Sequence, residues 1–387
     1  MSTKTKSPVR CYYCFSDKIV NYGVKRGVKI ADLPSGGKAN HIIIDRRRYL
    51  CKECGKNFLE KLQGVDEKRN LSLRLIAYIK QQSLHRSFLS IAKDVGLNEG
   101  TIRNIFKEFL SGLEESFSPI TPTILSFNEI IVASNPRYLV GNFELHTIVG
   151  ILPDIRSTTI GKYLEQLPDK ENVTAVVMDM NTDCRKMVNK YLPTAKIVVN
   201  PTDIDNTLLC ILEKLRQKTR EGLPSKELRQ LAHDREIIQK HLEELTEEDK
   251  KRLTSWEKLF KKLVFAYWRK EELRIILKEG NREEAMTQYL IWQNDVLADS
   301  IKEYFPIIDE ILDWQKEVFG WMELKVTDRD TYYQNVIDLR AALQNKLDRG
   351  SSFEAVKARI LQQQSTTSNK GIKFNKVIWR IVAGQHN

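Results

Sequence analysis

Two matched pairs of cysteines constrain this chain most. Cys11 and Cys14 form the first pair, Cys51 and Cys54 form the second, and two residues separate the members of each. That spacing lets one tight turn present two thiolates to a single ion, and two such turns complete a tetrahedral site. The pattern predicts a structural Zn²⁺ ion held by the four thiolates. The alternatives are a redox pair or chance spacing.

Positive charge gathers in the same segment. The chain of 387 residues is long enough for two or three domains and has a formal net charge of +11. Residues 1–58 hold thirteen Lys and Arg against four Asp and Glu, which gives that segment a net charge of +9. Such a concentration is typical of a protein that contacts phosphates, so double-stranded DNA is the expected partner.

The hydropathy pattern predicts a cytoplasmic protein. Residues 1–10 are polar and basic with no apolar core behind them, and no run of eighteen apolar residues follows anywhere. We therefore expect no membrane partner. Cysteines in a reducing compartment are not expected to form disulfides, which favours the metal interpretation of the two pairs.

Residues 87–106 fit a helix-turn-helix. Ala92 allows two helices to approach closely, Gly96 can make the turn between them, and Ile102 can pack beneath. The second helix would turn four polar side chains outward toward DNA: Thr101, Arg103, Asn104 and Lys107. The alternative is an ordinary helical hairpin. We also expect Arg46, Arg47 and Arg48 to contact phosphates.

The next segment alternates strands and helices, which predicts an α/β domain over residues 123–210. One of its apolar strands ends in the carboxylate Asp179, which is where a nuclease can place a metal ligand. An Asp at a strand end is also a common turn residue. Residues 207–320 are charged throughout, with apolar residues at helical spacing.

Taken together, these parts resemble a family of bacterial insertion-sequence transposases. The resemblance rests on short stretches in a shared order: 30–34 and 46–51 in the cysteine-rich part, 151–156 and 177–180 in the α/β part, 245–248 in the helical part and 353–361 near the end. It implies an α+β multidomain protein with a zinc ribbon, a helix-turn-helix and an RNase H-like domain that carries a long helical insertion. The implied boundaries are 1–62 for the ribbon, 63–118 for the helix-turn-helix, 123–210 for the first part of the RNase H-like domain, 211–320 for the insertion, 321–365 for its closing helices and 366–387 for a tail.

The resemblance also shows departures at the catalytic positions. The family has an Asp followed by Glu on its first catalytic strand, and here Asn128 stands at the Asp position. Tyr332 falls at the position of the family's catalytic Glu. The Asp and His that follow the fourth strand in the family match Asn200 and Asp203. Asp179 alone remains of the acidic triad.

Three carboxylates near the missing Glu are possible substitutes, namely Glu323, Asp328 and Asp330. Glu129 is a poor substitute for its neighbour Asn128, because successive side chains of a strand point to opposite faces.

Three functions remain in view. The first is a catalytically inactive protein that binds DNA as a regulator, a targeting factor or an accessory factor. The second is an active transposase that cleaves and joins DNA strands at element ends with Mg²⁺. The third is an interaction scaffold that does not bind DNA. The resemblance further suggests a homodimer and a protein partner encoded by a mobile element.

Overall fold

The computed structural model describes residues 10–116, 120–132, 134–221, 223–224, 231, 235–278, 280–324, 334, 336, 338, 352–362 and 372–373. These residues form two compact units. The N-terminal unit contains the described residues of 10–116 and 352–362, and the second unit contains those of 120–338 and 372–373.

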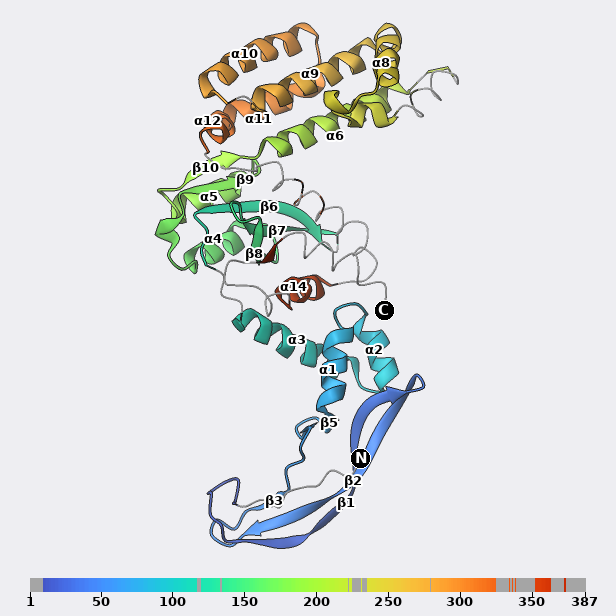
Figure 1. Cartoon of the computed structure of the whole chain (residues 1–387), viewed down its shortest axis with the longest axis vertical. Coiled ribbons are helices and arrows are strands. Elements are labelled where there is room, and N and C mark those ends of the chain that lie inside the picture. Colours follow the sequence, from blue (N-terminus) through green and yellow to red (C-terminus); the bar gives the residue numbers. More distant parts are fainter. Residues whose placement is uncertain are drawn as a thin grey trace. The chain divides into compact units, whose positions relative to one another are not determined.

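The N-terminal unit is a long β-ribbon followed by three helices, with one helix from much later in the chain (Figure 1). Its sheet has the order β3-β2-β1-β5-β4. Its elements are β1 (Ile19–Ser35), β2 (Lys38–Cys51), β3 (Asn57–Leu59), β4 (Val65–Asp66), β5 (Leu71–Ser72), α1 (Leu73–Gln82), α2 (Phe88–Val95), α3 (Glu99–Ser116) and α14 (Phe353–Gln362).

The helix-turn-helix forms between α2 and α3 as its sequence predicts. The Ser87 side chain caps α2 by accepting the Ser90 N–H, and Gly96 ends the helix with a φ of 68°. Ala92 is buried at the crossing, and Ile102 of α3 packs in the same core. That core also takes in Leu71, Leu75 and Ile79 from before the turn and Ala31 from the ribbon.

The ribbon is fastened to these helices at one end. Asp32 is 1% exposed, accepts a hydrogen bond from the Ser72 hydroxyl at 2.6 Å and accepts another from Arg74 Nε at 2.6 Å. Ser72 is also the N-cap of α1. A Cβ on Gly96 would lie 2.6 Å from the Cβ of Ala39 in β2, so the turn of the helix-turn-helix leaves no room there.

Helix α14 completes the outer face of α3. Ala355, Ala358 and Leu361 pack against Leu84, Phe106 and Leu110. Arg359 donates to the Leu84 carbonyl, and Lys357 pairs with Glu114 of α3 at 2.5 Å. The sequence assigned residues 321–365 to the closing helices of the α/β domain, whereas α14 groups with the helix-turn-helix. Leu84 and Phe88 cover part of the apolar face of α3, and α14 buries more of it, which is the physical reason for this docking.

The second unit is a mixed sheet with a helical insertion (Figure 1). The sheet order is β10-β9-β6-β7-β8-β11. Strands and sheet-proximal helices are β6 (Ile124–Val132), β7 (Asn135–Asn142), β8 (Thr147–Ile151), α4 (Ser157–Glu165), η1 (Lys170–Asn172), β9 (Ala175–Met178), α5 (Thr182–Tyr191), β10 (Lys196–Val199) and β11 (Ile372–Lys373). The helices that follow β10 are α6 (Pro201–Thr219), η2 (Arg235–Gln239), η3 (Leu242–Glu244), α8 (Glu247–Leu259), α9 (Lys261–Lys278), α10 (Arg282–Ala298), η4 (Lys302–Tyr304), α11 (Phe305–Asp313), α12 (Gln315–Gly320) and η5 (Trp321–Glu323).

Strand directions in this sheet decide where polar side chains meet. β6, β7 and β8 are successive antiparallel neighbours, whereas β6, β9 and β10 run parallel. Helix α4 leads from β8 to β9, helix α5 leads from β9 to β10, and the two helices pack against each other (Figure 1). Consequently the carboxyl ends of β6, β9 and β10 point the same way.

One apolar core continues from the sheet into the insertion. Leu125 and Phe127 of β6 belong to it, and so do Trp256 of α8 and Tyr289 of α10. In the described part of the chain, no helix is both long enough and apolar enough to cross a bilayer.

The insertion also encloses charges. Lys270 and Glu271 on α9 are each 1% exposed and lie 2.5 Å apart. Arg274, one turn later, pairs with Glu271 at 3.0 Å. Burial alone would raise the pKa of Glu271, but hydrogen bonds from His241 and Lys270 lower it below its ordinary value. These paired charges explain how so charged a segment forms a packed interior.

Candidate functional site

The four cysteines of the two knuckles meet at one point. The sulfurs of Cys11 and Cys54 are 3.7 Å apart, those of Cys14 and Cys51 are 3.6 Å apart, and all four lie within 4.8 Å of one another. Ligands at a Zn–S distance of about 2.3 Å stand about 3.8 Å apart in a tetrahedron. The predicted cluster is therefore consistent with a structural zinc site. Among described residues, it is the one group of three or more His, Cys, Asp or Glu side chains close enough to share an ion.

The backbone of the two knuckles explains why the thiols converge. Phe15 N–H donates to the Cys11 carbonyl and Gly55 N–H donates to the Cys51 carbonyl, both at 3.0 Å. Phe15 and Gly55 have φ values of 58° and 69°, so each turn is closed by a residue in the left-handed conformation. Backbone N–H groups of Cys54 and Glu53 lower the pKa of the Cys51 thiol to about 7, whereas burial and hydrogen bonds to the other three thiols raise the pKa of Cys14 to about 12. A lower pKa favours the thiolate, which is the form that binds zinc.

A basic hollow lies beside the side of α3 that carries Thr101, Asn104 and Lys107, away from the face covered by α14. Its volume is about 380 Å³. Three of the four predicted DNA contacts line it together with residues that precede α1; the lining is Lys68, Arg69, Thr101, Asn104, Lys107 and Glu108. The spacing of 101, 104 and 107 places those side chains along one side of the helix. The sequence did not single out Lys68 and Arg69, although an adjacent basic pair just before a helix was a visible signal. Arg69 pairs with Asp66 at 2.6 Å and with Glu108, which leaves Lys68 and Lys107 as the cations of the hollow available to a phosphate.

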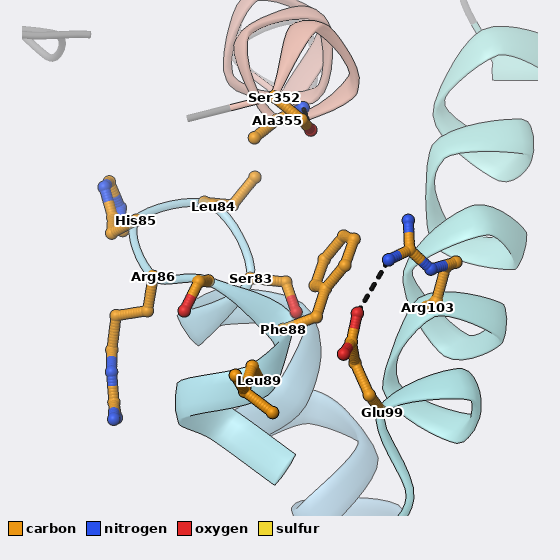
Figure 2. Close-up of a pocket in the computed structure, with 11 residues that line it drawn as sticks. Ser83, Leu84, His85, Arg86, Phe88, Leu89, Glu99, Arg103, Ser352 and Ala355 are labelled. Atoms are coloured by element: carbon orange, nitrogen blue, oxygen red, sulfur yellow. Dashed lines mark hydrogen bonds and ion pairs between the residues drawn. The ribbon is translucent and has the colours of Figure 1, made fainter. Parts of the chain in front are cut away.

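The fourth predicted contact, Arg103, lies in a different place. It pairs with Glu99 at 2.7 Å, and its guanidinium stands 5.1 Å from the centre of the Phe88 ring. Figure 2 shows it at the rim of a second pocket of about 230 Å³, between α3, the α1–α2 loop and the start of α14. The structure thus separates Arg103 from Asn104 and Lys107.

The three consecutive arginines of β2 have different environments. Arg46 is 5% exposed, donates to the Glu60 carbonyl at 2.5 Å and pairs with Glu67 at 2.9 Å. This placement speaks against the phosphate contact expected of Arg46. Arg47 and Arg48 are exposed and stay candidates for that role.

Three strands of the second unit reach the same level at the predicted catalytic positions. Met178 of β9 is paired in register with both β6 and β10. The next residues along the three strands are therefore neighbours, and they are Asn128, Asp179 and Asn200. Only the middle one carries a carboxylate.

The two amides at this level are engaged within the fold. Asn128 is 3% exposed, and its side-chain amide donates to Ser126 Oγ at 3.3 Å. Asn200 is also 3% exposed, and its side chain caps α6 by accepting the Thr202 N–H at 2.8 Å. Asn200 thus has a structural role at the start of a long helix.

Tyr138 of β7 is paired directly with Glu129 of the neighbouring strand β6. Burial raises the pKa of the Tyr138 phenol, and the negative charges of Asp179, Glu129 and Asp203 raise it further. Asp179, Glu129 and Asp203 therefore all act electrostatically on this one phenol.

Of the three carboxylates that could substitute for the missing Glu, the structure describes Glu323. Glu323 pairs with Arg282 at 2.7 Å and faces Lys196 at 3.6 Å. Lys196 is the first residue of β10, whereas Asp179 follows the last residue of β9. Glu323 and Asp179 therefore lie at opposite ends of these parallel strands. Tyr332, Asp328 and Asp330 lie outside the described residues.

Comparison with known families gives three matches along the chain. The transposase model of the ISL3 DDE type matches residues 126–328. The helix-turn-helix domain of transposase family ISL3 matches residues 60–110. The zinc finger of the transposases IS204, IS1001, IS1096 and IS1165 matches residues 7–54. No curated protein matches the chain. The predicted fold class, a zinc ribbon, a helix-turn-helix and an RNase H-like domain, is confirmed, while its boundaries stay predictions.

Proposed function

The chain belongs to the ISL3 family of transposases, and on that premise we propose that it is a sequence-specific DNA-binding protein that no longer cleaves DNA. It would act as a regulator, a targeting factor or an accessory factor. The helix-turn-helix is its DNA-binding element, and the four-cysteine cluster is proposed to hold a structural zinc ion.

The observation that carries the loss of cleavage is Asn128. It occupies the strand position level with Asp179, where the resemblance places an acid, and it offers one neutral oxygen in place of a charged carboxylate. Two-metal catalysis holds the attacking and leaving oxygens between cations about 3.5–4 Å apart, and several carboxylates are needed to bind them. The set of Asn128, Asp179 and Asn200 carries one negative charge and does not fit a pair of Mg²⁺ ions.

One observation favours the alternative, an active transposase. Glu129 and Asp203 act electrostatically on the same tyrosine as Asp179 does. A movement that brought these carboxylates together would restore a metal site without Asn128. Asp328 and Asp330, which lie outside the described residues, belong to the same alternative.

A cleavage assay with three proteins tests the proposal. The DNA is a fragment selected from random sequence by the full-length chain, and Mg²⁺ or Mn²⁺ is supplied. We expect no cleavage by the wild-type chain or by Asp179→Ala, with DNA binding intact in both. Asn128→Asp should raise Mn²⁺ affinity, measured by calorimetry, because it restores a carboxylate beside Asp179. Cleavage by wild type that is lost in Asp179→Ala would refute the proposal and support the alternative.

The hollow on α3 supplies the DNA contacts in this proposal. Lys68 and Lys107 would contact phosphates, whereas Thr101 and Asn104 would reach base edges in the major groove. Arg103 is proposed to support α3 through Glu99 and Phe88.

A further inference from the structure

The middle of the β1–β2 ribbon is contacted by Glu60 and Glu67, which bond to Arg47 and Arg46, but no third strand pairs with it in the described residues. In the described residues, β3 pairs with β2 at 48–50 and β5 pairs with β1 at Ala31. Between these two points the ribbon continues without a third strand, and residues 21–27 and 40–43 are all exposed. An isolated two-stranded ribbon is marginally stable, so this one is maintained by its ends. One end is the cysteine knuckles and the other is the helix-turn-helix core.

The two faces of this exposed stretch differ. Val24 lies opposite Arg47, and Lys29 lies opposite Ile43, and these four side chains share one face. We call them the open face. Val24 is 52% exposed and Ile43 is 65% exposed. The other face contains the buried Arg46, which pairs with Glu67.

The charge of the stretch is positive. Its exposed basic residues are Lys25, Arg26, Lys29, Arg47 and Arg48. Its one acidic residue, Asp45, accepts a hydrogen bond from the Gly27 N–H at 2.8 Å. The open face itself has two of these cations, Lys29 and Arg47, and Asp45 lies on the same side of β2 between Arg47 and Ile43, whereas Lys25 and Arg48 belong to the other face. The stretch as a whole, with five exposed cations against one carboxylate, complements a polyanion and would repel a basic protein surface.

We propose that the open face lies along a groove of double-stranded DNA as a second contact beside the helix-turn-helix. Lys29 and Arg47 would contact phosphates, while Val24 and Ile43 would meet the apolar edges of bases, such as thymine methyl groups. The major groove admits a two-stranded ribbon. About nine residues per strand span roughly 30 Å, close to one helical turn of DNA at about 34 Å. This inference rests on the proposed DNA binding and extends it to a bipartite site.

The test uses the full-length chain on DNA that it selects from random sequence. Lys29→Gln/Arg47→Gln removes the cations of the open face. The matched control is Lys251→Gln/Lys258→Gln on α8, which removes the same charge from exposed positions of the insertion. Affinity is measured from low to high salt, and protection from hydroxyl radicals gives the length of the site.

We expect the double variant to reduce the slope of log affinity against log salt by about 1.8, since each lost phosphate contact removes about 0.9. Its protected region should shorten at one end by about 5–9 base pairs, since the ribbon covers about 30 Å at roughly 3.4 Å per pair. The control should match wild type. Zinc content should be unchanged in every variant.

Three outcomes would overturn the inference in distinguishable ways. If Lys107→Gln weakens binding while the open-face variant matches wild type in slope and footprint, the second contact does not exist, although the proposed function stands. If wild type shows no sequence preference, both fall. If Ile43→Thr converts a dimer to a monomer in sedimentation and leaves the footprint unchanged, the open face is an interface between copies.

Discussion

The Ser72 hydroxyl donates a hydrogen bond to the Asp32 carboxylate at 2.6 Å, and the same hydroxyl caps α1 by accepting the Leu75 N–H. One side chain therefore begins the helix and holds the ribbon against it. Arg74, in the first turn of α1, pairs with the other side of Asp32.

This relationship predicts a pH-dependent stability of the N-terminal unit. Hydrogen bonds from Arg74 and Ser72 lower the pKa of Asp32 to about 2, although burial opposes them. A lowered pKa means that the stabilisation is fully present above the unfolded value near 4 and is lost as pH falls toward 2. Asp32→Ala should cost about 2–3 kcal/mol at pH 7, because it leaves the buried Ser72 hydroxyl without an acceptor. Chemical denaturation measures this, and the exposed Asp17→Ala should cost under about 0.5 kcal/mol. Equal stability of both variants would contradict the argument.

We predict one zinc ion per chain. Cys51→Ser removes one of the four thiolate ligands, so bound zinc should fall nearly to zero. The knuckle should then unfold, since it has too small a core to persist without metal. Metal analysis by mass spectrometry measures the content. Cys210→Ser changes an exposed cysteine of the second unit and should leave zinc unaltered. Retention of zinc by Cys51→Ser would rule out the site.

Two glycines of the helix-turn-helix should respond oppositely to alanine. Gly96→Ala places a Cβ at a φ of 68° and 2.6 Å from Ala39, so we expect a loss of about 1–3 kcal/mol. Gly112→Ala adds a Cβ in α3 where nothing lies within 4 Å, and it should stabilise by about 0.5–1 kcal/mol. Thermal denaturation of the two variants decides the matter. A Gly96→Ala protein as stable as wild type would show that the turn can relax.

Substitutions around the hollow should separate two kinds of DNA contact. Lys107→Gln should weaken binding to all sequences alike and lower the salt slope by about one unit. Asn104→Ala should cost about 1–3 kcal/mol on the preferred site and relax specificity at one position. Arg46→Ala should instead lower the melting temperature, because it strips Glu67 of its buried partner. If Arg46→Ala changes only the salt slope, its guanidinium reaches DNA after all.

Helix α14 should stabilise the helix-turn-helix. Ala358 is fully buried against the α3 side, so Ala358→Asp would bury an unpaired charge and should destabilise that unit by about 3 kcal/mol or more. Hydrogen exchange of α3 amides reports the effect locally. Glu354→Ala, on the exposed side of the same helix, is the control. Unchanged protection of α3 in Ala358→Asp would mean that the docking contributes nothing.

Local patterns were enough to predict the zinc knuckles and the turn at Gly96. Both depend on spacing within a few residues, and spacing is visible in a sequence. The resemblance, rather than any local pattern, singled out Asn128 together with Asp179, and the strand register places the two at the same level. Their catalytic roles stay predictions.

Long-range partners explain the rest. In the sequence Arg46 cannot be told apart from Arg47 and Arg48, and only the fold reveals that its guanidinium pairs with Glu67. The pairing of Arg103 was visible in the sequence, since Glu99 lies four residues earlier on the same helix and competes with DNA phosphates for the guanidinium. The docking of α14 on α3 joins segments that share no local pattern, so nothing short of the folded chain could place it.

That docking also has a consequence for synthesis. Arg359 follows its partner Leu84 by 275 residues. At about 5–20 residues per second, a ribosome needs roughly 14–55 s to make that stretch. During this time Phe106 and Leu110 have only local neighbours such as Leu84 and Phe88, and the part of their surface that α14 covers stays exposed on the nascent chain. A product terminated early would contain every residue of the helix-turn-helix and still lack its finished core, so truncated chains would compete poorly with complete ones for DNA.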